Sequence, residues 1–204
     1  MVFFSLRIAS ILSILTVLAL SAACTWVQPN PSPWMIHAYP NVQQSLDYSC
    51  GPAAAVAFAR FYRIHADESA AIKKMGTDPK TGTSPEAIAS WLRSKGLKVG
   101  WGEHGTLDRL KENLRKGKPT LVEWVDWGGH WVAVIGFDDQ GTVETDDDEI
   151  ILADSYDRVD GNPDGLTHFN VERFDTMWFD ALNFGRLMKK IYLHEVSGGE
   201  KVSH

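Results

Sequence analysis

The chain contains a cysteine placed where it could act as a nucleophile. Cys50 begins the run Cys-Gly-Pro-Ala-Ala-Ala, and a helix is predicted over residues 50–62, with Pro52 in its first turn, where a proline loses no hydrogen bond. A thiol at a helix N-terminus lies at the positive end of the helix dipole, which favours the nucleophilic thiolate. The alternative is a small buried cysteine that only starts a core helix.

Two further segments supply the groups that such a thiol needs. The run VAVIGF predicts a buried strand, and His130 stands just before it, after Gly128 and Gly129. Two glycines let a substrate or another backbone approach closely. The run IILA predicts a further strand and ends in Asp154. A thiol, an imidazole and a carboxylate in this order match the nucleophile, base and orienting group of a cysteine hydrolase.

The runs Q-x5-CGPAA, GGHWVAVIGFD and ILADSYD together resemble the papain-clan bacteriocin-processing (double-glycine leader) cysteine peptidases and their stand-alone relatives, over residues 40–160. The resemblance implies a papain-like cysteine peptidase fold. It implies Cys50 as the nucleophile, His130 as the general base and acid, and Asp154 as the residue that orients the imidazole. The side chain of Gln44, six residues before the cysteine, would help to bind the oxyanion.

The sequence departs from this family at two positions. Ser49 stands where an Asp or Asn often precedes the cysteine, and Ser155 stands where a Pro often follows the aspartate. Neither change removes a catalytic atom. The exporters of the family carry the peptidase fused to a membrane ATPase. This chain has no length for such an ATPase, so leader processing is not carried over from the resemblance.

The first residues have the pattern of a bacterial export signal. Arg7 gives a positive start, residues 8–20 form an apolar run that is short for a membrane span, and small residues precede Cys24. Leu20-Ser-Ala-Ala-Cys24 also resembles a lipobox, whose cysteine becomes the lipid-modified N-terminus. We therefore predict a signal peptide over residues 1–23 and an exported protein that a lipid on Cys24 holds at the membrane of the cell envelope. A soluble periplasmic or secreted protein is the alternative.

The rest of the chain is predicted to form one domain with short extensions. Residues 24–39 are expected to be the lipidated N-terminus and a Pro-rich tether, residues 40–196 the peptidase domain, and residues 197–204 a disordered tail. If Cys24 carries a lipid, Cys50 is the one remaining thiol. A lone cysteine in an oxidising compartment favours a reactive thiol; a Cys24–Cys50 disulfide is the alternative.

The composition limits the partners of the protein. A net charge of −6 and a pI near 5.6 argue against a nucleic acid. Cysteines and histidines are too scattered for a zinc site of ordinary ligand spacing. The run DRVDGNPDG resembles a calcium loop only loosely, because its carboxylate spacing does not match the EF-hand. No metal and no cofactor are therefore expected.

Helices are expected in the first half of the chain and strands in the second. This order indicates an α+β fold, with a helical N-terminal half and a C-terminal antiparallel sheet. In a papain-like arrangement the thiol would then lie on the helical side of a cleft and the imidazole on the sheet side. The predicted helices span residues 50–62, 67–75, 84–96 and 106–117, and the predicted strands 99–101, 120–125, 130–137, 149–153 and 186–192.

Competing residues are less well placed than the three named above. Asp138 and Asp139 follow the histidine strand at its far end, about 25 Å away at the rise of a strand. The other histidines are expected at the surface, with His168 in a long loop and His194 near the end of the chain. They are His37, His65, His104, His168, His194 and His204.

Trp127, next to Gly128 and Gly129, is predicted to line a groove that holds an extended peptide. The sequence thus predicts a cysteine peptidase or amidase that forms an acyl-enzyme on Cys50. Two alternatives stay open. The acyl group could pass to an amine or thiol in a transferase, or the chain could be a non-catalytic lipoprotein that binds peptide.

Overall fold

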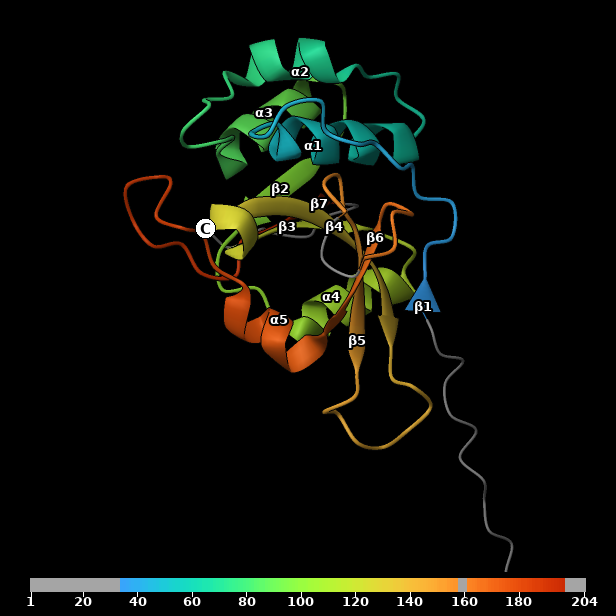
Figure 1. Ribbon diagram of the computed structural model, residues 1–204. Coiled ribbons are helices and arrows are strands. Elements are labelled where there is room, and N and C mark those ends of the chain that lie inside the picture. Colours follow the sequence, from blue (N-terminus) through green and yellow to red (C-terminus); the bar gives the residue numbers. More distant parts are fainter. Residues whose placement is uncertain (1–33, 158–160, 197–204) are drawn as a thin grey trace, which may run out of the picture.

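Three helices from the first half of the chain form a layer over one face of an antiparallel sheet: α1 and α3 contact the strands, and α2 packs on α1 and α3 (Figure 1). They are α1 (Cys50–Phe61), α2 (Glu68–Met75) and α3 (Pro85–Ser94). The computed structural model describes residues 34–157 and 161–196. The predicted signal peptide, Cys24 and the tail over residues 197–204 lie outside the described residues.

Local signals in the sequence fix the starts of α2 and α3. The side chain of Asp67 accepts a hydrogen bond from the Ala70 N–H at the start of α2, and Gly76 ends this helix in the left-handed conformation. Ser84 caps α3 in the same way, with a proline at the first helical position. The helices predicted in the first half are therefore confirmed.

The sheet has the strand order β2-β7-β3-β4-β5-β6, and the short β1 pairs with β4. All pairings are antiparallel. A turn at Asp126–Gly128 joins β3 to β4 in a hairpin. The strands are β1 (Trp34–Met35), β2 (Val99–Gly102), β3 (Thr120–Trp124), β4 (His130–Asp138), β5 (Glu149–Ala153), β6 (Leu166–Asn170) and β7 (Tyr192–Glu195).

Strand β4 is buried on both faces, because each face packs against a helical layer. Trp131, Ala133 and Ile135 belong to the core between the sheet and α1–α3, whereas Val132 and Val134 belong to the core on the other face. Two helices cover that other face, α4 (Leu107–Arg115) and α5 (Val171–Met177). This double burial explains why β4 reads as a continuous apolar run.

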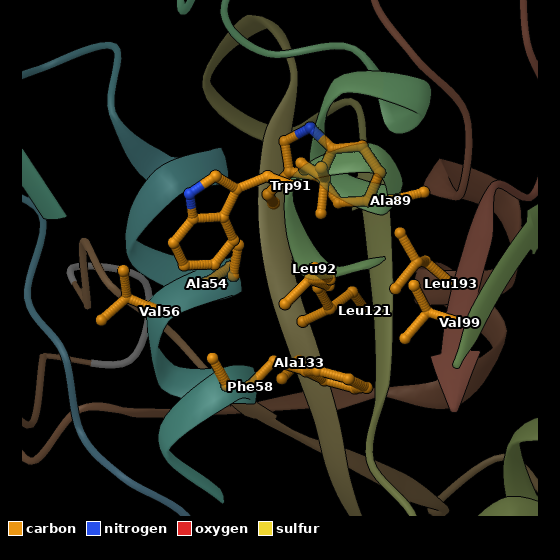
Figure 2. Close-up of a cluster of buried hydrophobic side chains, with 14 of the residues drawn as sticks. Ala54, Val56, Phe58, Ala89, Trp91, Leu92, Val99, Leu121, Ala133 and Leu193 are labelled. Atoms are coloured by element: carbon orange, nitrogen blue, oxygen red, sulfur yellow. The ribbon is translucent and has the colours of Figure 1, made fainter. Parts of the chain in front are cut away.

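Large side chains fill the core beneath α1. Figure 2 shows Phe58 of α1 and Leu92 of α3 beside Leu121 and Leu193 of the sheet. Phe58, Leu92, Leu121 and Leu193 each have no exposed area. Interiors are packed as densely as organic crystals, so this core fixes the position of α1, and hence of Cys50, over the sheet.

The strand predicted over residues 186–192 is wrong, because β7 spans Tyr192–Glu195. Lys190 has a φ of +51°, which interrupts an extended backbone just before β7. Met188 and Ile191 are buried all the same. Met188 and Ile191 pack on the core without pairing with a neighbouring strand. Their apolar pattern therefore indicated burial and was wrongly interpreted as a strand.

The structure also contains β6 and α5, which the sequence analysis did not predict. His168 is exposed as expected, but it lies on β6 and not in a long loop. His194 is not at the surface. It is 1% exposed on β7, and its Nδ1 lies 3.3 Å from Asn113 Nδ2.

Residues near the start of the described chain join the sheet. Trp34 and Met35 belong to the segment assigned to the tether, and they pair with Phe137 and Gly136 of β4. The boundaries of the domain stay a prediction. Within the described residues, no helix has the length and apolar character needed to cross a membrane.

Candidate active site

Cys50 is the first residue of α1, and its thiol faces the imidazole of His130 at the start of β4. The two side chains form a hydrogen bond. Cys50 is 7% exposed and His130 is 3% exposed. The structure therefore brings together a thiol on a helix and an imidazole on a strand, across the boundary between the helical layer and the sheet.

Asp154, the residue after β5, completes this line of polar groups. His130 Nε2 lies 2.7 Å from Asp154 Oδ1, so Nε2–H donates to the carboxylate and Nδ1 is left for the thiol. Two further donors hold the carboxylate in place. The Tyr156 N–H donates to Oδ1 at 2.8 Å, and the Thr167 hydroxyl donates to Oδ2 at 3.0 Å.

The electrostatics of the site favour an ionised thiol. Burial alone raises the pKa of the Cys50 thiol, but the hydrogen bond to His130 and the charge of this imidazole outweigh burial, so the pKa lies below its ordinary value. The backbone N–H groups of Trp131 and Gly51 also lower this pKa. The arrangement therefore favours the thiolate, the nucleophilic form of cysteine, more than an isolated thiol would.

The partners of the thiol are shifted in the complementary directions. Burial lowers the pKa of His130, but hydrogen bonds to Asp154 and Cys50 outweigh it and raise the value to about 10. Burial raises the pKa of Asp154, but its hydrogen bond to His130 outweighs burial and lowers the value to about 2. Between these two pKa values the imidazolium and the carboxylate are both charged, and the imidazolium can stabilise the thiolate.

A cavity of about 140 Å³ opens beside the thiol, and we call it the Cys50 cavity. Its two walls come from the two layers of the fold. The indole N–H of Trp131 on β4 donates to the Thr83 carbonyl at 2.9 Å, which ties the loop before α3 to the sheet. The residues around the cavity include Tyr48, Cys50, Thr83, Glu123, Trp127 and Gly129.

The Trp-Gly-Gly turn before β4 forms one edge of the Cys50 cavity. Trp127, Gly128 and Gly129 all have positive φ values, of 54°, 83° and 111°. Trp127 is 60% exposed, and its ring contacts Tyr156 at a centroid distance of 5.5 Å. Tyr156 in turn lies edge-on to His130 at 6.4 Å. An exposed indole is thus held next to the candidate base.

Gln44 lies beside Ser155, the residue that follows the candidate orienting aspartate. Its Oε1 accepts a hydrogen bond from the Ser155 hydroxyl at 3.0 Å, and its Nε2 donates to the Leu46 carbonyl at 2.9 Å. The neighbouring Gln43 instead donates to Asn41 and to the Asp154 carbonyl. Gln44 is not part of the cavity wall.

No group of three histidine, cysteine, aspartate or glutamate side chains gathers as metal ligands within residues 34–157 and 161–196.

The sequence analysis missed two polar residues of the site. Thr167 had no signal of its own, because β6 was not predicted. The sequence did contain a signal for Glu123, because it is an acidic residue within the apolar run Leu121–Trp124. Its side chain lies on the same face of the strand as that of Leu121, two positions earlier.

Comparisons with known proteins show the family of this chain. The model of the Peptidase_C39-like family matches residues 36–178. This chain belongs to that family. No curated protein sequence matches the chain. The membership confirms the family resemblance that the sequence analysis drew from its three motifs, and it supports a cysteine peptidase kind of function.

Solved structures of C39 peptidase domains share the fold. The peptidase domain of Streptococcus ComA, a bifunctional ABC transporter of a quorum-sensing pathway, is 17% identical, with a TM-score of 0.55 over 77% of this chain and 98% of that one. A C39-like peptidase from Bacillus anthracis is 11% identical, with a TM-score of 0.57 over 81% and 98%. The predicted α+β, papain-like fold is confirmed.

A third structure is the double-glycine-motif protease of an AMS/PCAT transporter in complex with the leader peptide. It is 16% identical to this C39-like chain, with a TM-score of 0.50 over 76% of this chain and 90% of that one. At these identities the three likenesses show the shared fold. The roles of individual side chains follow from the geometry of this chain.

The carboxylate of Asp154 should control how readily Cys50 reacts at acidic pH. An Asp154→Asn substitution removes the negative charge that raises the pKa of His130, so less imidazolium remains to stabilise the thiolate. We expect iodoacetamide to label Cys50 at least about tenfold more slowly at pH 6, which corresponds to one pKa unit of the thiol. Mass spectrometry of the labelled protein measures the rate.

Asp146→Asn serves as the control, because Asp146 is exposed in the turn before β5. It should label at the wild-type rate. Equal labelling of the Asp154→Asn and wild-type proteins across pH 5–9 would show that the carboxylate does not act on the thiol.

Proposed function

We propose that this C39-like protein is a cysteine peptidase that hydrolyses a peptide or amide bond through an acyl-enzyme on Cys50. The observation that carries the proposal is the buried, hydrogen-bonded line from the Cys50 thiol through His130 to Asp154 at the edge of a cavity. A thiol with a lowered pKa next to an oriented imidazole is the arrangement that nucleophilic catalysis requires.

In this mechanism the Cys50 thiolate attacks the carbonyl carbon of the scissile bond. The Cys50 backbone N–H at the start of α1 and the Gln44 side-chain amide stabilise the oxyanion that forms. The Nε2 of Gln44 carries two N–H groups, and the Leu46 carbonyl takes one of them. His130 then protonates the leaving amine, and it later removes a proton from the water that releases the acyl group.

The substrate in this proposal is an extended peptide that lies along the Trp-Gly-Gly turn. Trp127 offers an exposed indole, and Gly128 leaves the backbone open to a second chain. The solved protease with the leader peptide, named above, has this fold and is a peptide-binding protein by its own description. An aromatic surface beside the nucleophile suits peptide binding.

A mixture of peptides from a bacterial cell-envelope extract tests the proposed function. The wild-type protein should cleave a subset of these peptides and carry an acyl group on Cys50, both detected by mass spectrometry, whereas Cys50→Ala should do neither. When acceptor amines are added, the products should still be those of hydrolysis, without attached amine. Products joined to the amine would indicate an acyltransferase, and peptide binding without any covalent intermediate would indicate a non-catalytic binding protein.

Gln44 should affect the chemical step and spare the reactivity of the thiol. Loss of one oxyanion donor costs roughly 3 kcal/mol, so Gln44→Ala should slow peptide cleavage about a hundredfold while iodoacetamide labelling of Cys50 stays nearly unchanged. Gln43→Ala is the matched control and should retain cleavage. A parallel loss of cleavage and labelling in Gln44→Ala would instead assign Gln44 a structural role through its contact with Ser155.

We also propose that the protein is exported and that a lipid on Cys24 anchors it to the membrane of the cell envelope. The apolar run after Arg7 and the segment Leu20-Ser-Ala-Ala-Cys24 support this proposal. Cells fed a radiolabelled fatty acid should incorporate it into the wild-type protein and fractionate it with membranes. Cys24→Ala should remove both properties. A wild-type protein in the soluble envelope fraction without label would establish the soluble secreted form.

A further inference from the structure

Glu123 is a buried acidic residue on the wall of the Cys50 cavity, and the mechanism above gives it no task. It lies on β3 opposite Trp131 of β4. Its neighbour two positions earlier, Leu121, packs in the core below α1. Because side chains alternate along a strand, the carboxyl of Glu123 also lies on the face of the sheet that carries α1 and Cys50.

The hydrogen bonding of Glu123 is incomplete. The residue is 2% exposed, and its Oε2 has no hydrogen-bond partner in the described part of the chain. The buried amide of Asn113 on α4, by comparison, has partners: it donates to the Thr120 hydroxyl at 3.0 Å and contacts His194. The indole Nε1 of Trp124, next to Glu123 on β3, is also without a partner in the described residues. A buried carboxyl without a partner is costly, so a ligand that supplies a hydrogen-bond donor to Glu123 would remove this cost.

The Trp-Gly-Gly turn packs closely against Glu123, and the Cys50 cavity is the space that its side chain lines. A Cβ at Gly129 would come within 3.3 Å of Glu123 Oε1 and would collide with the amide of Asn183. That amide donates to the Gly128 carbonyl at 3.0 Å and so fixes the turn. The cavity volume of about 140 Å³ is below the range for drug-sized ligands. It suits one side chain of a longer substrate.

Charges of both signs lie near Glu123: Cys50 and Asp180 are negative, whereas His130 is positive and Lys80 lines the same cavity. Burial first, and then the negative charges of Cys50 and Asp180, raise the pKa of Glu123 to about 9. Asp180 is itself fully buried and has an unpaired Oδ2 in the described structure. A positive group close to the carboxyl would reverse these effects, because an opposite charge favours the ionised acid.

We propose that Glu123 makes the Cys50 cavity a binding site for a positively charged side chain, a lysine or arginine of the peptide substrate. The inference rests on the proposed peptidase function and specifies its substrate. The ammonium or guanidinium group donates hydrogen bonds to the unpaired carboxyl oxygen, and the scissile carbonyl then lies beside the Cys50 sulfur. Glu123 is thus a specificity residue, separate from the three residues that carry out the chemistry.

Matched peptides provide the test. Internally quenched octapeptides with lysine at one position are compared with peptides that carry norleucine there, and the position is moved along the chain. At one position the wild-type protein should cleave the lysine peptide with a kcat/KM at least about tenfold higher than that of the norleucine peptide. About tenfold is the effect expected of one hydrogen bond to a charged group. Glu123→Gln should lower this preference to near unity and retain cleavage of the norleucine peptide.

Glu112→Gln is the control for the loss of one negative charge, because Glu112 is on α4 and pairs with Lys116 outside the cavity. It should keep the full preference for lysine. Equal cleavage of lysine and norleucine peptides by the wild-type protein would overturn the inference and leave the peptidase function intact. A preference for lysine that persists in Glu123→Gln would overturn it as well.

A binding measurement separates this inference from the proposed function. If the wild-type protein cleaves none of the peptides, calorimetry with the Cys50→Ala protein decides the inference alone. The cation site is supported if Cys50→Ala binds the lysine peptide more tightly than the norleucine peptide and if the double variant Cys50→Ala/Glu123→Gln loses this difference. Equal binding of the two peptides, or no binding, overturns the inference. Thermal melting checks the folding of Glu123→Gln. Should this variant not fold, the lysine preference of the unaltered protein decides.

Discussion

The buried hydrogen bond between Cys50 and His130 is the interaction on which the site depends. Burial opposes the charge on each group, yet the thiol pKa is lowered and the pKa of His130 is raised to about 10, because each group supports the charge of the other and Asp154 supports the imidazole. Breaking such a buried pair leaves an uncompensated charge. The site therefore needs a scaffold that holds the thiol and the imidazole at hydrogen-bonding distance.

The fold meets this requirement by joining two layers. Helix α1 carries the thiol, and the strands carry the imidazole and the groups that fix it. Asp154 receives hydrogen bonds from the Tyr156 N–H and from Thr167 on β6. The apolar core around Leu92 sets the position of α1 over the sheet. This Peptidase_C39-like protein thus places its candidate nucleophile where tight packing, and not a flexible loop, determines the geometry.

The same strands that position the base also shape the cavity for substrate. Glu123 on β3 and the Trp-Gly-Gly turn before β4 stand next to His130 along one hairpin. The candidate base and the proposed cation site are therefore carried by one hairpin. Rigid elements hold side chains more accurately than loops do, and a carboxyl left unpaired in such an element becomes useful once a ligand supplies its partner.

The sequence by itself determined the elements whose signals are local. The first-half helices were predicted from their own residues, and the order of Cys50, His130 and Asp154 indicated the family. Only the tertiary structure revealed the full set of partners. β6 and α5 gave no clear pattern, and His194 is buried against Asn113, 81 residues away in the chain. The Cys50 cavity likewise brings Glu123 of β3 together with residues from distant segments, such as Cys50 and Thr83. Propensity and periodicity report a residue's near neighbours, whereas burial and pairing depend on which remote segments fold against it.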